Sequence, residues 1–180
     1  MGEIKQPERA KLFCAIMYAE SADIASVISD LENAFGKVET RGEKYPFTYT
    51  DYYTPEFGGN LYKEMVVFGS TVEQEKLAEI KRFTNSVEEK YLAENGKRSI
   101  NIDPGFVLPS KLILASTKDF SHRIYVGEGI YAEITFMFSR KGVRFLDWTY
   151  PDYRSSEVSG FFIKVREKYM SEMKSGGKPE

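Results

Sequence analysis

Two periodicities of apolar residues alternate along the first half of the chain. Apolar runs or period-two alternation predict strands at 11–19, 45–49, 61–69 and 99–102. Apolar residues that recur every three or four positions predict helices over 24–35 and 77–91. The order strand, helix, strand, strand, helix, strand is that of a ferredoxin-like βαββαβ core, with both helices on one face of an antiparallel sheet.

The second half of the chain predicts an antiparallel β-meander followed by a C-terminal helix. Its strands are expected at 111–116, 121–126, 130–138 and 143–148. Ser155 is placed to start the helix, whose apolar face carries Val158, Phe161, Phe162, Val165 and Tyr169. We therefore predict a single α+β domain over 1–180, with an ordered core over about 8–173 and frayed ends at 1–8 and 174–180.

Short motifs predict where several elements begin and end. Ser21 is placed to cap the first helix, and Ser70-Thr71-Val72-Glu73 has the form of a capping box before the second. Pro46 indicates that its strand lies at an edge of the sheet. Asp103-Pro104-Gly105 is a turn sequence, because Asp bonds to its own backbone and Gly accepts a positive φ.

The hairpin around Gly127-Glu128-Gly129 allows a prediction of register. A three-residue loop places Val126 opposite Ile130, Ile124 opposite Ala132 and His122 opposite Ile134 on one face. Tyr125 then faces Tyr131, and Arg123 faces Glu133, on the other face. This register separates apolar from polar residues, and it predicts that Arg123 and Glu133 form a cross-strand ion pair.

Composition and charge limit the classes of function. Hydrophobic residues make up 42% and aromatic residues 14% of the 180 residues, which is enough for a globular core. The net charge of −2 provides no overall field that would attract nucleic acid or an anionic membrane. A single cysteine, Cys14, cannot build a disulfide or zinc framework, and no run of 18 apolar residues predicts a transmembrane helix. We therefore expect a cytoplasmic protein that binds neither nucleic acid nor a membrane.

The polar residues between two of the predicted strands are the best candidates for a site. Ser116, Thr117, Lys118 and Arg123 follow the apolar run 112–115 and carry the hydroxyl and cationic groups that an anionic ligand needs. His122, the only histidine, and Asp119 are candidates for a general base. Asp103 could orient His122 or help to hold a Mg²⁺ ion.

Other interpretations of these residues remain open. His122 could be a hydrogen-bonded structural residue, Lys118 part of a solvated turn, and Asp103 an ordinary turn residue. The segment 116–119 misses the N/T-K-x-D guanine-recognition pattern by one position, and the chain has no GxxxxGK[ST] loop. The sequence thus excludes a P-loop GTPase, and it leaves open whether the protein is an enzyme.

Aromatic residues concentrate in the segments 45–57 and 145–153. Interleaved aromatic rings can stack on bases, but acidic neighbours such as Asp51 and Asp147 oppose a phosphate backbone. These segments could instead form a small core under a loop, or a surface for self-association or for a protein partner.

Four strings in the chain resemble a family of uncharacterised bacterial proteins, some of whose members carry the label GTP-binding protein. The strings are NIDPG (101–105), ASTKDFSHRIY (115–125), IYAEIT (130–135) and DWTYPDYR (147–154). The resemblance covers about residues 8–173 and implies one cytoplasmic domain of family length.

Two functions are compatible with these observations. The first is a domain that binds a small anionic ligand, a nucleotide or a phosphorylated metabolite, and that could act on a phosphoester. The alternative is a non-catalytic interaction or self-association module that uses the aromatic segments 45–57 and 145–153.

Overall fold

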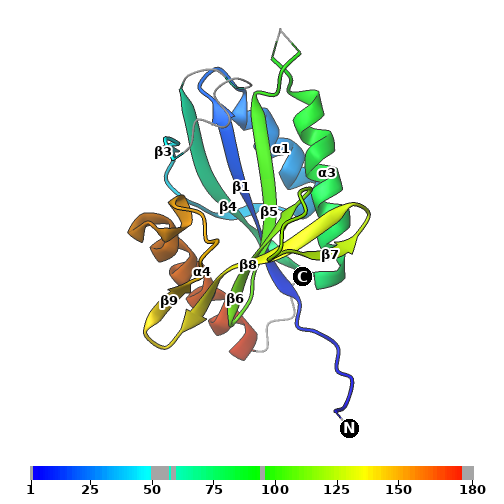
Figure 1. Ribbon diagram of the computed structural model, residues 1–180, viewed down its shortest axis with the longest axis vertical. Helices are drawn as coiled ribbons and strands as arrows, with labels where there is room; N and C mark the ends of the chain where they lie inside the picture. Colours follow the sequence, from blue (N-terminus) through cyan, green and yellow to red (C-terminus); the bar gives the residue numbers. More distant parts are fainter. Residues whose placement is uncertain (1, 50–56, 58–59, 94–95, 176–180) are drawn as a thin grey trace.

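The fold combines helices with one antiparallel sheet, which confirms the predicted α+β class. The computed structural model describes residues 2–49, 57, 60–93 and 96–175 (Figure 1). The described elements are β1 (Ala10–Ala19), α1 (Ile24–Phe35), β2 (Val38–Arg41), β3 (Tyr45–Pro46), β4 (Leu61–Val72), α3 (Leu77–Lys90), β5 (Ile100–Val107), β6 (Lys111–Ser116), β7 (Ile124–Gly127), β8 (Ile130–Ser139), β9 (Gly142–Phe145) and α4 (Ser156–Lys174). No helix in these ranges is both long and apolar enough to cross a membrane.

The strands follow the order β2-β4-β1-β5-β6-β8-β7, with β3 added to β4 and β9 added to β8. Strand β1 lies inside the sheet, with β4 on one side and β5 on the other, and both pairings are antiparallel. Because both faces of β1 are covered, its apolar residues run without interruption from Leu12 to Ala19 instead of alternating with polar residues.

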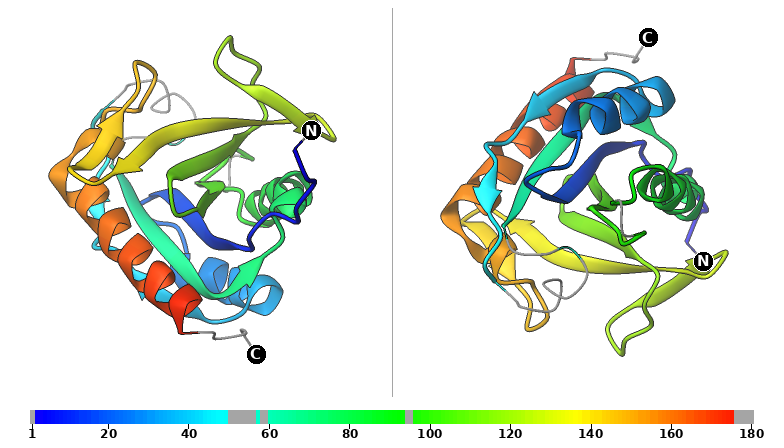
Figure 2. Two further views of the ribbon diagram at one scale, coloured as in Figure 1. Left: turned by 90° about the horizontal axis from the view of Figure 1, so that it is seen from below. Right: turned by 90° about the horizontal axis from the view of Figure 1, so that it is seen from above.

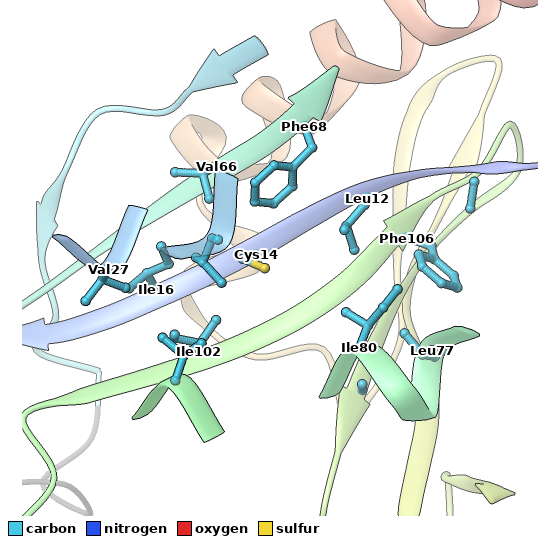
Figure 3. Packing of buried hydrophobic residues seen from close by; sticks show 14 of the residues in the cluster. Leu12, Cys14, Ile16, Val27, Val66, Phe68, Leu77, Ile80, Ile102 and Phe106 are labelled. Atoms are coloured by element: carbon cyan, nitrogen blue, oxygen red, sulfur yellow. The ribbon is translucent and has the colours of Figure 1, made fainter. Parts of the chain in front are cut away.

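The helices cover opposite faces of the sheet. Residues of α1 and α3 pack with Leu12, Cys14 and Ile16 of β1 in one apolar core (Figure 3). Residues of α4 pack with the alternate residues of β1, Phe13 and Ala15, in a second core. Figure 2 shows α4 across the sheet from α1 and α3.

The helix starts follow local side-chain chemistry only in part. Ser155 caps α4 as predicted, because its hydroxyl accepts a hydrogen bond from the Val158 amide at 3.1 Å. Helix α1 is capped by Asp23 rather than Ser21. The predicted capping box is wrong, since Ser70–Val72 continue β4, where Thr71 pairs with Lys11 of β1. Pairing with β1 provides hydrogen bonds for the backbone groups of this segment, whereas in a capping box side chains would have to provide them.

The turn predicted at Asp103-Pro104-Gly105 is also wrong, because these residues lie in the middle of β5. They pair in order with Ala15, Cys14 and Phe13 of β1. Glycine is required here for close packing: a Cβ at position 105 would overlap the Ile113 carbonyl oxygen and lie 2.6 Å from the Phe13 ring.

The hairpin between β7 and β8 has part of the predicted register. Ile124 pairs with Ala132 and Tyr125 with Tyr131, as predicted, but a bulge then places Gly127 opposite Ile130. Strand β7 begins at Ile124, so His122 and Arg123 lie in the preceding loop rather than in the ladder. The predicted Arg123–Glu133 ion pair is present, with Nε and Oε2 2.8 Å apart.

Candidate functional site

Strands β5 and β6 separate soon after they pair, and the candidate site lies where they diverge. They are paired only through Gly105–Val107 and Leu112–Leu114. Strand β6 continues along β8 to Ser116, whereas the first half of β5 lies beside β1 and near α3. In Figure 1 the upper part of β5 stands between β1 and α3, while β6 and β8 lie by its lower end.

A polar cavity of about 340 Å³ occupies this opening. It is bounded by α3, by the first half of β5 and by the end of β6. Its lining residues are Lys81, Asn85, Glu88, Glu89, Arg98, Asn101, Asp103, Leu114, Ala115, Ser116, Thr117, Lys118, Arg123, Glu133 and Tyr150. The predicted ligand-binding residues Ser116, Thr117, Lys118 and Arg123 therefore line one cavity together with Asp103.

A second, more aromatic cavity of about 420 Å³ adjoins the first. It is lined by Phe47, Tyr49, Lys63, Asp103, Leu114, Lys118, Phe120, Arg123, Tyr150, Pro151, Asp152 and Tyr153. The two aromatic segments of the sequence thus meet here, with Phe47 and Tyr49 from the first and Tyr150 and Tyr153 from the second. Tyr52 and Tyr53 of the first segment lie outside the described residues.

The two cavities share Asp103, Leu114, Lys118, Arg123 and Tyr150 in their walls. We refer to the two cavities together as the cleft.

Arg123 joins the parts of the cleft wall. Its guanidinium donates hydrogen bonds to Glu133 at 2.8 Å, to the Ser116 hydroxyl at 2.9 Å and to the Lys118 carbonyl at 2.9 Å. It also donates to the Tyr150 hydroxyl at 2.7 Å and stacks on the Phe120 ring. Since four of its five N–H groups are engaged, Arg123 acts mainly as a support for the wall.

Tyr150 belongs to this wall and keeps its proton at neutral pH. Partial burial, together with the nearby charge of Glu133, raises the pKa of Tyr150 to about 12. The protonated hydroxyl accepts a hydrogen bond from Arg123 and keeps its own proton as a donor.

The two predicted general bases lie outside the lining of both cavities. Asp119 is exposed in the loop before β7. His122 is stacked between Trp148 and Phe120, with ring centroids 5.0 Å and 6.0 Å away. Its Nε2 lies 3.2 Å from the buried carboxylate of Glu133. These contacts with two aromatic rings and one carboxylate hold the His122 ring in place.

An ionic network forms the floor of the polar cavity, with Lys81 and Glu88 buried and Asp103 and Arg98 partly exposed. The Lys81 ammonium donates to Asp103 at 2.9 Å and to the Ile102 carbonyl at 2.7 Å. The Glu88 carboxylate accepts from the Ile102 amide at 2.7 Å and from Arg98 at 3.3 Å. Burial raises the pKa of Glu88, and the charge of Lys81 opposes that effect only in part.

The pKa of Asp103 shifts in the opposite direction from that of Glu88. Burial by itself would raise its pKa, but the charge and hydrogen bond of Lys81, with a further hydrogen bond from Asn101, hold the pKa of Asp103 below its usual value. Both carboxylate oxygens are engaged in this way, Oδ1 by Lys81 and Oδ2 by Asn101. Among the described residues there is no group of three or more His, Cys, Asp or Glu side chains that could hold a metal ion.

The depressed pKa predicts a pH-dependent effect of the substitution Asp103→Asn. The ionised carboxylate stabilises the folded state above the unfolded-state pKa of about 4, and this contribution is lost as pH falls through the lower folded-state pKa. Asp103→Asn should therefore lower the Tm at pH 7, and the difference from wild type should shrink below about pH 4. Thermal unfolding from pH 7 to pH 3 measures this, with the exposed Asp147→Asn as control. A difference that stays constant with pH would contradict the prediction.

A second buried network lies at the aromatic cavity. The Lys63 ammonium donates to Asp152 at 2.6 Å, and the Tyr45 hydroxyl donates to the same oxygen at 3.1 Å. Burial and the charge of Asp152 raise the pKa of Tyr45, so this hydroxyl remains a donor. The Lys63–Asp152 ion pair joins residues 89 positions apart in the chain.

Lys63, Lys81 and Asp152 were not among the predicted site residues, and Tyr150 and Tyr153 were noted only as members of the aromatic segment 145–153. A signal was present for the two lysines, since each occupies a position where the apolar pattern of its strand or helix faces inward. A charged residue at such a position requires a buried partner. No local pattern identifies that partner.

Comparison with known proteins places the chain in a family but not beside a characterised protein. A family model described as a domain of unknown function, DUF4416, matches residues 8–169. No curated protein matches the chain. No solved structure matches it either.

Proposed function

Because the chain belongs to the DUF4416 family, whose function is unknown, we propose a function from its own residues: the protein binds a small anionic ligand, a nucleotide or phosphorylated metabolite, in the cleft. The shared wall of the two cavities is the observation that carries the proposal. Lys118 and Arg123 line both cavities, beside an aromatic surface on one side and a polar floor on the other.

The size and lining of the cleft support a small molecule. Cavities of about 340 Å³ and 420 Å³ lie within the range of small-molecule sites, which are typically about 300–1,000 Å³. Such sites combine apolar and aromatic walls with a few converging polar groups. Phe47, Tyr49, Phe120 and Tyr150 supply the aromatic wall.

The polar end of β6 supplies the groups proposed to bind the anion. Ser116 and Thr117 carry hydroxyls at the rim, and a lysine ammonium such as that of Lys118 binds phosphate as a point charge. The Ser116 hydroxyl accepts a hydrogen bond from the Lys118 amide at 3.1 Å, which shapes this turn. Arg123 keeps these residues in place through its bonds to the Ser116 hydroxyl and the Lys118 carbonyl.

The proposal concerns binding and includes no catalytic step. Phosphoester chemistry with Asp119 or His122 as general base would require the ligand to reach those side chains. Both lie outside the described lining of the cleft.

The alternative, an interaction module built on the segments 45–57 and 145–153, has less support. Phe47, Tyr49, Tyr150 and Tyr153 line the cleft, where they can contact a small ligand. Trp148 has a structural contact within the protein, since its indole N–H donates a hydrogen bond to the Ile134 carbonyl at 2.9 Å.

Within the fold itself, we infer that residues 10–107 form a ferredoxin-like core. The strand order β2-β4-β1-β5, with α1 and α3 packed on one face, supports this inference. The cleft would then lie where the added β-meander leaves the edge strand of that core.

A thermal-shift screen with nucleoside mono-, di- and triphosphates, with and without Mg²⁺, tests the proposed function. At least one nucleotide should raise the Tm of the wild type, because ligands that bind only the folded state stabilise it. Lys118→Ala should abolish most of that shift. The matched control is Lys141→Ala, which removes an exposed lysine in the β8–β9 turn, away from the cleft.

Two results would contradict the nucleotide form of the proposal. One is the absence of any shift with the wild type. The other is a shift that Lys118→Ala leaves as large as Lys141→Ala does.

A further inference from the structure

The hydroxyl of Tyr153 is buried without a hydrogen-bond partner. It is the one buried side-chain polar atom among the described residues for which no partner is found, and Tyr153 is only 1% exposed. The other buried tyrosines contrast with it, since the hydroxyls of Tyr18, Tyr45 and Tyr169 bond to Glu64, Asp152 and the Arg9 carbonyl. A buried unpaired hydroxyl is unfavourable in a folded protein, so a specific one in a cavity wall points to an absent partner.

The ring of Tyr153 is firmly placed. It stacks on Phe162 of α4 with an angle of 8° between the planes, and burial raises its pKa well above the usual value. The hydroxyl therefore remains protonated at neutral pH and presents a donor.

Lys63 lies over the face of the same ring. The Lys63 ammonium lies 4.9 Å from the centroid of the Tyr153 ring and 5.2 Å from that of Phe47. An ammonium has three N–H groups, and one of these donates to Asp152. Both Lys63 and Tyr153 line the aromatic cavity.

The charge at this place favours a neutral acceptor over an anion. The Lys63 charge is balanced by the Asp152 carboxylate, which is 2% exposed and also accepts from Tyr45. The surroundings are therefore rich in donors but formally neutral. The aromatic walls formed by Phe47, Tyr49 and Tyr150 suit a planar ring.

We propose that the Tyr153 hydroxyl forms a base-recognition subsite by donating a hydrogen bond to the carbonyl oxygen of a planar ring, the ring itself lying in the aromatic cavity. The ligand class is thus a nucleotide whose base carries a ring carbonyl, with its phosphate at Lys118. This inference rests on the proposed function and adds the chemistry of the ligand's ring.

Two matched pairs of nucleotides test the subsite. Inosine and adenosine 5′-monophosphate carry a carbonyl or an amino group at the same ring position, as do guanosine and 2,6-diaminopurine riboside 5′-monophosphate, and the amino member of each pair has no ring carbonyl. An amino group would leave the Tyr153 hydroxyl unpaired, so we expect the carbonyl member of at least one pair to bind about tenfold more tightly by calorimetric titration.

The substitution Tyr153→Phe removes only the hydroxyl. It therefore distinguishes an effect on ligand recognition from an effect on the stability of the fold. It should erase most of the preference for the carbonyl member while leaving the Tm of the free protein no lower than that of wild type, because no hydrogen bond is lost. The matched control is Tyr169→Phe, which removes a hydroxyl bonded to the Arg9 carbonyl, away from the cleft. It should lower the Tm by about 2–4 °C and keep the preference.

The outcomes distinguish the two proposals. Equal binding of both members of each pair, or a preference that persists in Tyr153→Phe, overturns the subsite but leaves the proposed function standing if Lys118→Ala abolishes binding. A fall in Tm for Tyr153→Phe as large as that for Tyr169→Phe also overturns the subsite, since the hydroxyl would then be satisfied in the free protein. No binding of any of the four nucleotides overturns the subsite, whereas the proposed function is decided by the thermal-shift screen with the wider set of nucleotides.

Discussion

Replacing Gly105 with alanine is expected to lower the free energy of unfolding by about 3 kcal/mol, at the upper end of the range for overpacked cores. The added Cβ would overlap the Ile113 carbonyl oxygen of β6 and lie 2.6 Å from the ring of Phe13, which is fully buried. The obstacle includes backbone of the paired strand, so rotation of a side chain cannot relieve it. Chemical denaturation measured by circular dichroism gives the free energy.

The matched control for this glycine is Gly160→Ala in helix α4. A Cβ at position 160 has no heavy atom within 4 Å, and alanine favours the helix over glycine by up to about 1 kcal/mol. We therefore expect Gly160→Ala to stabilise the protein slightly. If Gly105→Ala were as stable as wild type, the close approach of β5, β6 and Phe13 would not hold.

Replacing Glu133 with alanine is expected to lower the free energy of unfolding by about 3–5 kcal/mol. The Glu133 and Arg123 side chains are 1% and 4% exposed, so the substitution would leave a buried guanidinium without its counter-charge. It would also remove the carboxylate that faces His122. Thermal and chemical unfolding measure the loss, and nucleotide shifts in the surviving folded protein would report a weakened cleft wall.

The exposed Arg82–Glu128 ion pair provides the control for this prediction. Its nitrogen–oxygen distance of 2.6 Å is shorter than the 2.8 Å of the Arg123–Glu133 pair, but its side chains are 63% and 52% exposed. Solvent screens such a pair, so Glu128→Ala should produce no measurable change in stability. Similar small effects of Glu128→Ala and Glu133→Ala would show that burial does not decide the strength of these pairs.

Regular spacing made several elements predictable. The apolar run of β1, the inward face of α3 and the Ser155 cap of α4 depend on residues close in sequence, and the structure has all three. The Arg123–Glu133 ion pair was predictable for the same reason, since a short hairpin brings the two side chains together.

Two local motifs failed because strand pairing competed with them. Ser70–Val72 and Asp103–Gly105 have the composition of a helix cap and a turn, and in isolation each would satisfy its own backbone. In the folded protein β1 lies between β4 and β5, and its backbone groups pair with both segments. Tertiary pairing thus overrides a local preference of about a kilocalorie per mole.

By itself, the sequence determined the α+β class, most of the helices and strands, and the polar character of residues 116–123. These properties depend on residue spacing and on near neighbours, which a linear pattern records. Only the tertiary structure decided that Lys63, Asp152 and Tyr153 meet at the aromatic cavity, and that Lys81 reaches Asp103 below the polar one. These contacts depend on the order of the strands and on the divergence of β5 from β6 at Gly105. The spacing of residues within one segment of the sequence specifies neither of these features.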